Sequence, residues 1–109
     1  MTTKDLKIAK RLAERLREAA SQSVKRIILY GSRVTGTAKP ESDYDFLVIE
    51  LGVVSKREEM KRLRQAISDL PYSVDAWVMG EEEFEETKKI IGGLAYPANK
   101  YGAVVYENA

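Results

Sequence analysis

Two aspartates separated by one residue, Asp43 and Asp45, are the strongest chemical signal in the sequence, because they open an apolar run. Side chains alternate faces along a strand, so both carboxylates are expected to point the same way. Like charges side by side repel each other, and the fold gains nothing from this repulsion. A hard cation such as Mg²⁺ removes it, since it prefers one or two carboxylates together with substrate phosphates. The spacing therefore indicates a metal site.

A glycine and a serine, Gly31 and Ser32, end the preceding apolar run and supply the complement to a metal. Glycine lets the backbone approach a ligand closely, and the amides at the start of a following helix hold an anion. A triphosphate on this turn and a metal on the aspartates must lie at one end of the sheet. The first strand ends there and the second begins there, so we expect the two strands to be antiparallel neighbours.

A third carboxylate, Asp75, interrupts another apolar run, residues 72–79. A lone aspartate in a buried strand is costly unless it is paired or bound to metal. Three aspartates on two adjacent strands are the ligand set of a two-metal site, which clamps the attacking and leaving oxygens of an in-line displacement. Simpler interpretations stay open. Asp43 and Asp45 would then be solvated turn residues, and Asp75 a solvated residue on an edge strand.

The composition narrows the chemistry further. The sequence has no cysteine, which excludes disulfides and thiolate chemistry, and no histidine, which excludes a Ser-His-Asp triad and His-ligated zinc. The net charge of +1 lacks the basic footprint of a nucleic-acid-binding protein. The 109 residues suit one domain, residues 1–109. We expect a cytoplasmic location, because no apolar stretch could span a bilayer and the N-terminus shows no signal-peptide pattern.

Helical and strand patterns alternate along the chain, which favours an α/β fold with a β-sheet packed by helices. Ser55 with Glu58 predicts a helix start, as does Thr2 with Asp5. The segment 32–37 is either a short helix or a loop. The predicted helices span residues 2–20, 55–70 and 81–91, and the predicted strands span residues 23–30, 44–50, 72–79 and 102–107.

The stretch GSRVTGTAKPESDYD, residues 31–45, resembles the signature of the polymerase-beta-like nucleotidyltransferase superfamily: Gly-Ser, ten residues, then Asp-x-Asp. Asp75 in a later strand matches as well, and the resemblance runs from the first helix to about residue 91. The short chain looks like the minimal nucleotidyltransferases, the antitoxin half of toxin–antitoxin pairs whose toxin is a HEPN-domain ribonuclease. The resemblance implies a mixed sheet, and transfer of AMP from ATP to a tyrosine of the partner HEPN toxin, which silences that toxin.

Carried over to this sequence, the resemblance also implies residue roles. Gly31 and Ser32 would hold the β- and γ-phosphates of ATP. Asp43 and Asp45 would bind two Mg²⁺ ions, with Asp45 bridging both. Asp75 would bind the catalytic metal and accept the proton of the attacking hydroxyl.

Four further residues near these motifs carry expectations. Arg33 follows the phosphate turn and is a candidate to neutralise triphosphate charge, with a surface ion pair as the equal alternative. Lys39 is a weaker candidate and is left unassigned. Tyr44 stands where an aliphatic residue is commoner, and we expect it to point into the opposite layer and to affect packing. Trp77 is expected to be a core or interface aromatic, with adenine stacking as the alternative.

Two other functions remain open at this stage. The chain could be a non-catalytic antitoxin that caps its toxin, or a small-molecule nucleotidyltransferase that acts as a dimer on antibiotic-like alcohols. An apolar surface around Trp77, Val104 and Tyr106 is a candidate partner interface.

Overall fold

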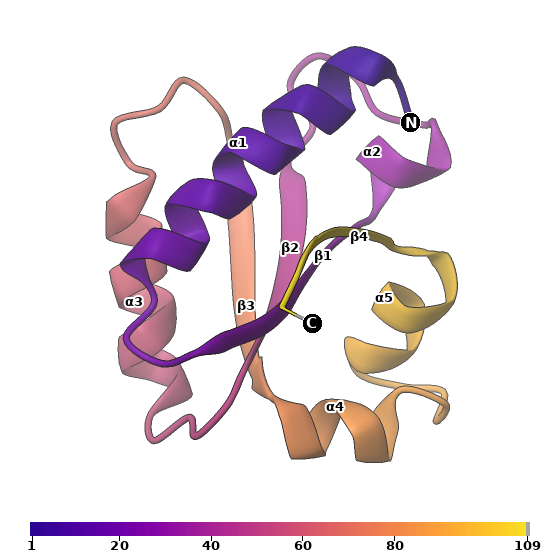
Figure 1. Cartoon of the computed structure of the whole chain (residues 1–109). Helices are drawn as coiled ribbons and strands as arrows, with labels where there is room; N and C mark the ends of the chain where they lie inside the picture. The colour runs from indigo at the N-terminus through magenta and orange to yellow at the C-terminus, as the bar shows by residue number, and fades with distance from the viewer. Residues whose placement is uncertain (109) are drawn as a thin grey trace.

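The computed structural model describes residues 1–108 and centres on a four-stranded sheet in the order β3-β2-β1-β4. The strands are β1 (Val24–Tyr30), β2 (Tyr44–Glu50), β3 (Val74–Gly80) and β4 (Ala103–Glu107). β1 pairs antiparallel with both β2 and β4, whereas β2 and β3 are parallel. The predicted mixed sheet and the predicted antiparallel first pair are therefore both confirmed (Figure 1).

One face of the sheet is covered by the two longest helices, α1 (Thr3–Ala19) and α3 (Lys56–Ala66). Leu12 and Leu16 of α1 and Leu63 of α3 pack with Phe46 and Val48 of β2 in the larger core. Both helices begin at the predicted caps, where the Thr2 and Ser55 hydroxyls each accept a hydrogen bond from the backbone three residues on.

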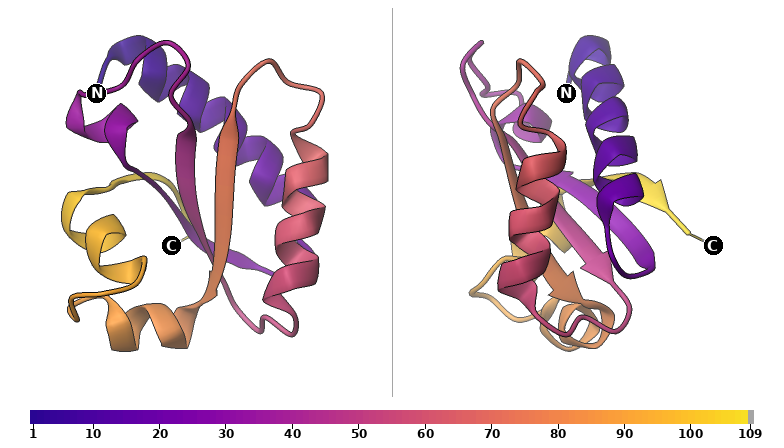
Figure 2. Two further views of the ribbon diagram at one scale, coloured as in Figure 1. Left: turned by 180° about the vertical axis from the view of Figure 1, so that it is seen from behind. Right: turned by 90° about the vertical axis from the view of Figure 1, so that its left-hand side faces the viewer.

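The opposite face carries two short helices, α4 (Glu81–Thr87) and α5 (Ala95–Tyr101). They enclose a smaller core in which Phe84 and Ala98 pack against Leu47, Ile49 and Met79. Seen from behind, α4 lies below the sheet and α5 to one side, and no helix lies in front of the upper parts of β2 and β3, whereas α1 passes behind them (Figure 2, left). The first residues of β2 and β3 therefore have no helical cover on this face.

Two helices end earlier than their sequence patterns predict. The helix predicted over residues 55–70 ends at Ala66, because Ser68 and Leu70 donate their amides into tight turns instead of continuing the helix. The helix predicted over residues 81–91 ends at Thr87, whose hydroxyl donates to the Glu83 carbonyl 2.6 Å away. Such side-chain bonds to the backbone compete with helix continuation.

A helix that the sequence analysis did not predict, α5, follows the glycine pair Gly92–Gly93 and contains Pro97. Proline lacks an N–H, but the first turn of a helix has no intrahelical acceptors for its N–H groups, so Pro97 fits there. None of the helices of the described chain is both long enough and apolar enough to cross a membrane.

Candidate active site

The strand register brings two of the three aspartates together. Asp45 of β2 lies directly opposite Asp75 of β3 in the parallel pair, and opposite Tyr30 of β1 in the antiparallel pair. Residues in register across a sheet point to the same face, so these three side chains form a row on the face that carries α4 and α5. The row lies where the helical cover ends (Figure 2).

Gly31 lies at the Tyr30 end of this row, since it follows Tyr30 directly in the chain. Its backbone adopts a φ of 83°. A Cβ built on Gly31 would lie 3.3 Å from the Asp45 Cγ and far inside the van der Waals distance of its Oδ2. Only glycine combines this left-handed conformation with such a close approach to a carboxylate. The Gly31 backbone therefore lies directly against the Asp45 side chain, and any side chain at position 31 would fill the small space between them.

The three aspartates are close enough to affect one another electrostatically. Burial, followed by the carboxylates of Asp75 and Asp43, raises the pKa of Asp45 from its ordinary value to about 6. Asp45 is therefore still largely ionised at neutral pH, but its charge is less favourable than that of an ordinary aspartate. A bound cation would offset this cost, and the oxygen donors fit a hard ion such as Mg²⁺.

The carboxylates do not yet converge on one point in this structure. Asp43 lies exposed before β2 and accepts a hydrogen bond from the hydroxyl of Ser73, which comes just before β3. Asp75 accepts a hydrogen bond of 3.1 Å from the indole Nε1 of Trp77. Accordingly, residues 1–108 contain no ready-made group of three acidic or histidine side chains around one cation position. Asp43, Asp45 and Asp75 alone therefore do not surround one cation position.

The turn after β1 carries backbone amides that are suited to binding an anion. Gly31 is the N-cap of α2 (Ser32–Thr35), and its carbonyl accepts from the amides of Val34 and Thr35 at 3.0 and 3.1 Å. The amides of Ser32 and Arg33 belong to the first turn, where a helix has no acceptors of its own. These amides are the groups that bind an anion at a helix start.

Arg33 is placed differently from the expectation that it neutralises phosphate charge. Its side chain is only 11% exposed and lies 3.3 Å from the Asp5 carboxylate of α1. It also donates to the Ser42 carbonyl at 2.7 Å and stacks 4.4 Å above the Tyr44 ring. The geometry therefore favours the alternative, an ion pair, and this pair is buried in the opposite layer instead of lying on the surface.

Tyr44 lies in the opposite layer, as expected, and is 2% exposed beneath α1. Its hydroxyl donates to Asp5 at 3.0 Å, and burial together with this carboxylate raises the pKa of Tyr44 to about 12. Tyr44 thus holds the backbone between Asp43 and Asp45 from behind. It serves packing, and its hydroxyl does not face the carboxylate row.

Two residues of the site were missed by the sequence analysis. Tyr30 completes the row beside Asp45, and burial and the carboxylates of Asp45 and Asp75 raise the pKa of its phenol. Ser73 holds Asp43. The sequence could have identified Tyr30, because Tyr30 directly precedes Gly31 and lies on the face expected for the aspartates. Ser73 gave no signal, since its role depends on how the loop before β3 meets β2.

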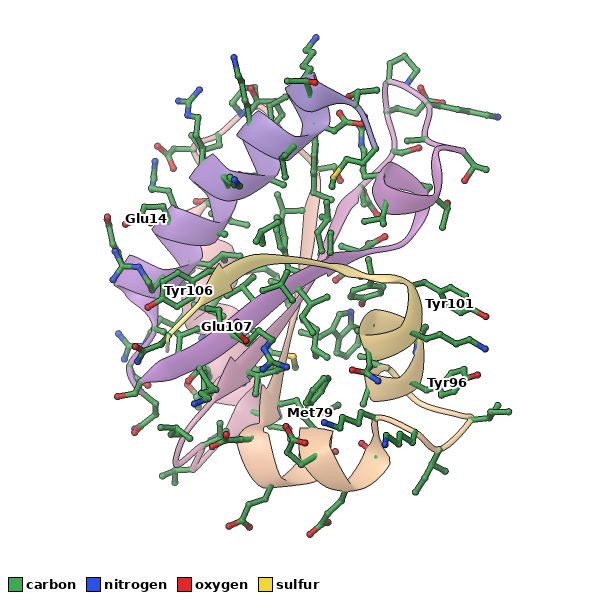
Figure 3. All side chains as sticks on the ribbon, turned by 45° about the vertical axis from the view of Figure 1, so that its right-hand side comes forward. Glu14, Met79, Tyr96, Tyr101, Tyr106 and Glu107 are labelled. Carbon is green, nitrogen blue, oxygen red and sulfur yellow. The ribbon has the colours of Figure 1, made fainter. Side chains whose placement is uncertain are left out.

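Trp77, Val104 and Tyr106, which the sequence suggests as one partner interface, do not form a single apolar surface. Trp77 is 40% exposed on the edge strand β3, whereas Val104 lies on the opposite edge strand, β4. Tyr106 is partly buried under the Arg17 guanidinium. The predicted interface around Trp77, Val104 and Tyr106 is therefore wrong as a single patch. On α5, Tyr96 and Tyr101 point outwards from the sheet (Figure 3).

Comparison with known proteins places this geometry in a family. Residues 9–94, well over half of the chain, match the model of the nucleotidyltransferase domain, so the chain belongs to the nucleotidyltransferase-domain family. The fold and the motif therefore define a transferase. The family assignment confirms the resemblance drawn from residues 31–45. No curated protein was found as a sequence relative.

Three solved structures share the fold. A protein described as a nucleotidyltransferase from Sulfolobus solfataricus has a TM-score of 0.65 at 20% identity, with 95% of this chain and 81% of that one covered. A toxin–antitoxin structure with AMP-PNP has a TM-score of 0.58 at 18% identity, covering 92% and 73%. The toxin–antitoxin pair MntA-HepT has a TM-score of 0.55 at 13% identity, covering 94% and 73%.

Proposed function

We propose that the chain transfers AMP from ATP to a hydroxyl, specifically a tyrosine, of a HEPN-domain toxin, and thereby acts as an antitoxin. The observation that carries the proposal is the Asp45–Asp75 pair in register beside Gly31. The likeness to a toxin–antitoxin structure with AMP-PNP and to MntA-HepT supports both the nucleotide and the kind of partner. In this proposal residues 1–109 work as one domain in the cytoplasm, where ATP and Mg²⁺ are available.

The proposed roles follow from position. Asp43 and Asp45 would hold two Mg²⁺ ions, and bound Mg²⁺ would supply neutralisation of the charge that develops on the phosphates. The amides of Gly31, Ser32 and the first turn of α2 hold the β- and γ-phosphates, because this turn lies directly against Asp45. Arg33 contributes indirectly, by fixing α2 against α1.

The chemistry is a single in-line displacement. The tyrosine oxygen of the partner forms a bond to the α-phosphorus, while the bond from that phosphorus to the bridging oxygen breaks and pyrophosphate leaves with its electron pair. Asp75 accepts the phenolic proton, since it faces the same site as Asp45 and only one indole N–H bonds to it. Trp77 orients Asp75 for this role through that bond.

Labelled ATP tests the proposal directly. The purified chain is incubated with the protein encoded beside it, Mg²⁺, and ATP labelled either on the α- or on the γ-phosphate. Transfer of AMP predicts that only the α-label appears on the partner and that Asp75→Asn prevents it. Label from the γ-phosphate would instead indicate phosphoryl transfer. No label, with full neutralisation of the toxin, would favour the capping antitoxin.

A further inference from the structure

A hollow lined by Glu50 and Glu59 lies at the opposite end of β2 from the aspartates, and it occupies about 450 Å³. It lies between the α1–β1 turn, the end of β2 and the start of α3, three segments that meet at the lower left of Figure 1. Glu50, the last residue of β2, is 0% exposed, and Glu59 of α3 is 5% exposed. This volume lies in the range of pockets that bind small molecules.

Glu50 is the unusual member of this pair. Both of its carboxyl oxygens are buried, and no hydrogen-bond donor of the described residues reaches either of them. A buried charge without a partner is costly. Burial first, and then the neighbouring Glu59, raise the pKa of Glu50 to about 9, so at neutral pH Glu50 keeps a proton and shares it with Glu59. One negative charge therefore remains on the pair.

Glu59 holds that charge in a fixed position. It accepts hydrogen bonds from the Ser21 amide at 2.9 Å and from the Ser21 hydroxyl at 2.6 Å. The exposed guanidinium of Arg62 lies 3.7 Å from it, at the mouth of the hollow. Burial alone would raise the pKa of Glu59, but hydrogen bonds with Glu50 and Ser21 and the charge of Arg62 outweigh it and lower the pKa, so Glu59 stays ionised. The chain thus already brings one loosely held cation to this carboxylate.

We propose that this hollow, floored by Glu50 and Glu59, binds a small organic cation through an ammonium or guanidinium group. Such groups are pure donors, with three and five N–H bonds respectively. The walls include the polar side chains of Gln22 and Gln65, whose amide oxygens can act as acceptors. This site is separate from the nucleotide site, so the inference does not depend on the proposed function.

The set of ligands in the hollow favours an organic cation over a metal ion. Glu58, Lys61 and Arg62 of α3 also line the hollow, whereas the α1–β1 turn contributes only the neutral Ser21 and Gln22. The described residues hold no group of three acidic side chains around one point here, and no substrate phosphate is expected to complete a metal's ligand shell. A guanidinium or ammonium needs only the Glu59 carboxylate and neutral acceptors.

Proton release gives the proposal a distinctive signature. A cation that reaches Glu59 stabilises a second negative charge nearby, so Glu50 loses its proton as the ligand binds. Calorimetry of the full chain with agmatine or putrescine, in two buffers of different ionisation enthalpy at neutral pH, measures this release. We expect saturable binding with a Kd on the order of 1 mM or tighter, and release of up to one proton.

Three variants distinguish binding in this hollow from nonspecific attraction of a cation to acidic side chains. Glu59→Gln should weaken binding about tenfold or more. Glu50→Gln keeps a donor toward Glu59 and should fold, but proton release should disappear. Arg62→Ala removes the chain's own competing cation and should tighten binding. Glu82→Gln, in the exposed first turn of α4, is the matched control and should change nothing.

Each contrary result overturns the proposal. These results are no saturation up to on the order of 10 mM of either amine, equal binding by Glu59→Gln, or binding without proton release. Binding of Mg²⁺ that survives in the variant Asp43→Ala with Asp45→Ala, but is lost in Glu50→Gln, would assign the hollow to a metal instead.

Discussion

Asp45 and Asp75 face each other across the parallel β2–β3 pair, one residue from the start of each strand. The two carboxylates share a face at the point where helical cover of the sheet ends, and burial together with Asp75 and Asp43 raises the pKa of Asp45 to about 6. This relationship links the sequence motif to its chemistry. Like charges in register repel each other, and a cation bound between them would relieve that repulsion.

Replacing Gly31 should disable the site. Gly31→Ala forces a φ of 83° on an alanine and drives its Cβ into the Asp45 carboxylate. We expect AMP transfer to fall at least about a hundredfold and the free energy of unfolding to drop by about 1–3 kcal/mol. Gly36→Ala is the matched control, because Gly36 has a φ of 88° and nothing lies within 4 Å of its added Cβ. Equal activity losses in the two variants would show that strain alone matters.

Removing the charge of Asp45 should stabilise the fold while it abolishes metal binding. The folded-state pKa is raised from 3.8 to about 6, so the stability from this group is present below about pH 4 and lost as the pH rises through 6. Asp45→Asn should therefore raise stability at pH 7 by roughly 1 kcal/mol, allowing for partial exposure. Thermal unfolding with and without Mg²⁺ measures both effects. Mg²⁺ should raise the Tm of the wild type only.

Glu50 should make stability fall with rising pH over a wider window. Its pKa is raised from 4.5 to about 9, so its favourable contribution is complete below about pH 4.5 and is lost as the pH rises through 9. Glu50→Gln should remove this slope and raise stability at pH 7 by about 1–3 kcal/mol. Urea unfolding across that range measures it. Glu58→Gln, exposed in the same hollow, should leave the slope unchanged, and a loss of stability in Glu50→Gln would contradict the account.

Arg33 should act through stability and not through nucleotide binding. Arg33→Ala breaks a buried pair with Asp5 and leaves that carboxylate with fewer partners. The free energy of unfolding should fall by about 3 kcal/mol. At a temperature where the variant is folded, the KM for ATP should stay within about twofold of the wild type. A large rise in KM with unchanged stability would return Arg33 to the phosphate site.

The sequence alone predicts on which face and at which end of the sheet Asp45 lies. Strand alternation fixes the direction of Asp45, and the Gly31–Ser32 turn lies beside it because β1 and β2 are antiparallel. Asp43 precedes β2, so alternation does not fix its direction. Both inferences use local rules whose outcome does not depend on distant parts of the chain.

What the sequence could not predict depends on contacts between distant segments. Arg33 turns away from the site because Asp5, 28 residues earlier, and Tyr44 receive it on the other layer. The Glu50–Glu59 pair likewise forms only when α3 packs beside the end of β2. The sequence analysis did not predict α5, because glycines and a proline, which usually break helices, lie just before and at its beginning.

The intact mass of the protein encoded beside this one, after incubation with this chain, ATP and Mg²⁺, tests the central claim most directly. The account predicts a gain in whole units of AMP, located on a tyrosine, and no gain with the variant that carries Asp43→Ala and Asp45→Ala together. An unchanged mass in a mixture that still forms a stable, neutralised complex would contradict it, and the chain would then act by capping its partner.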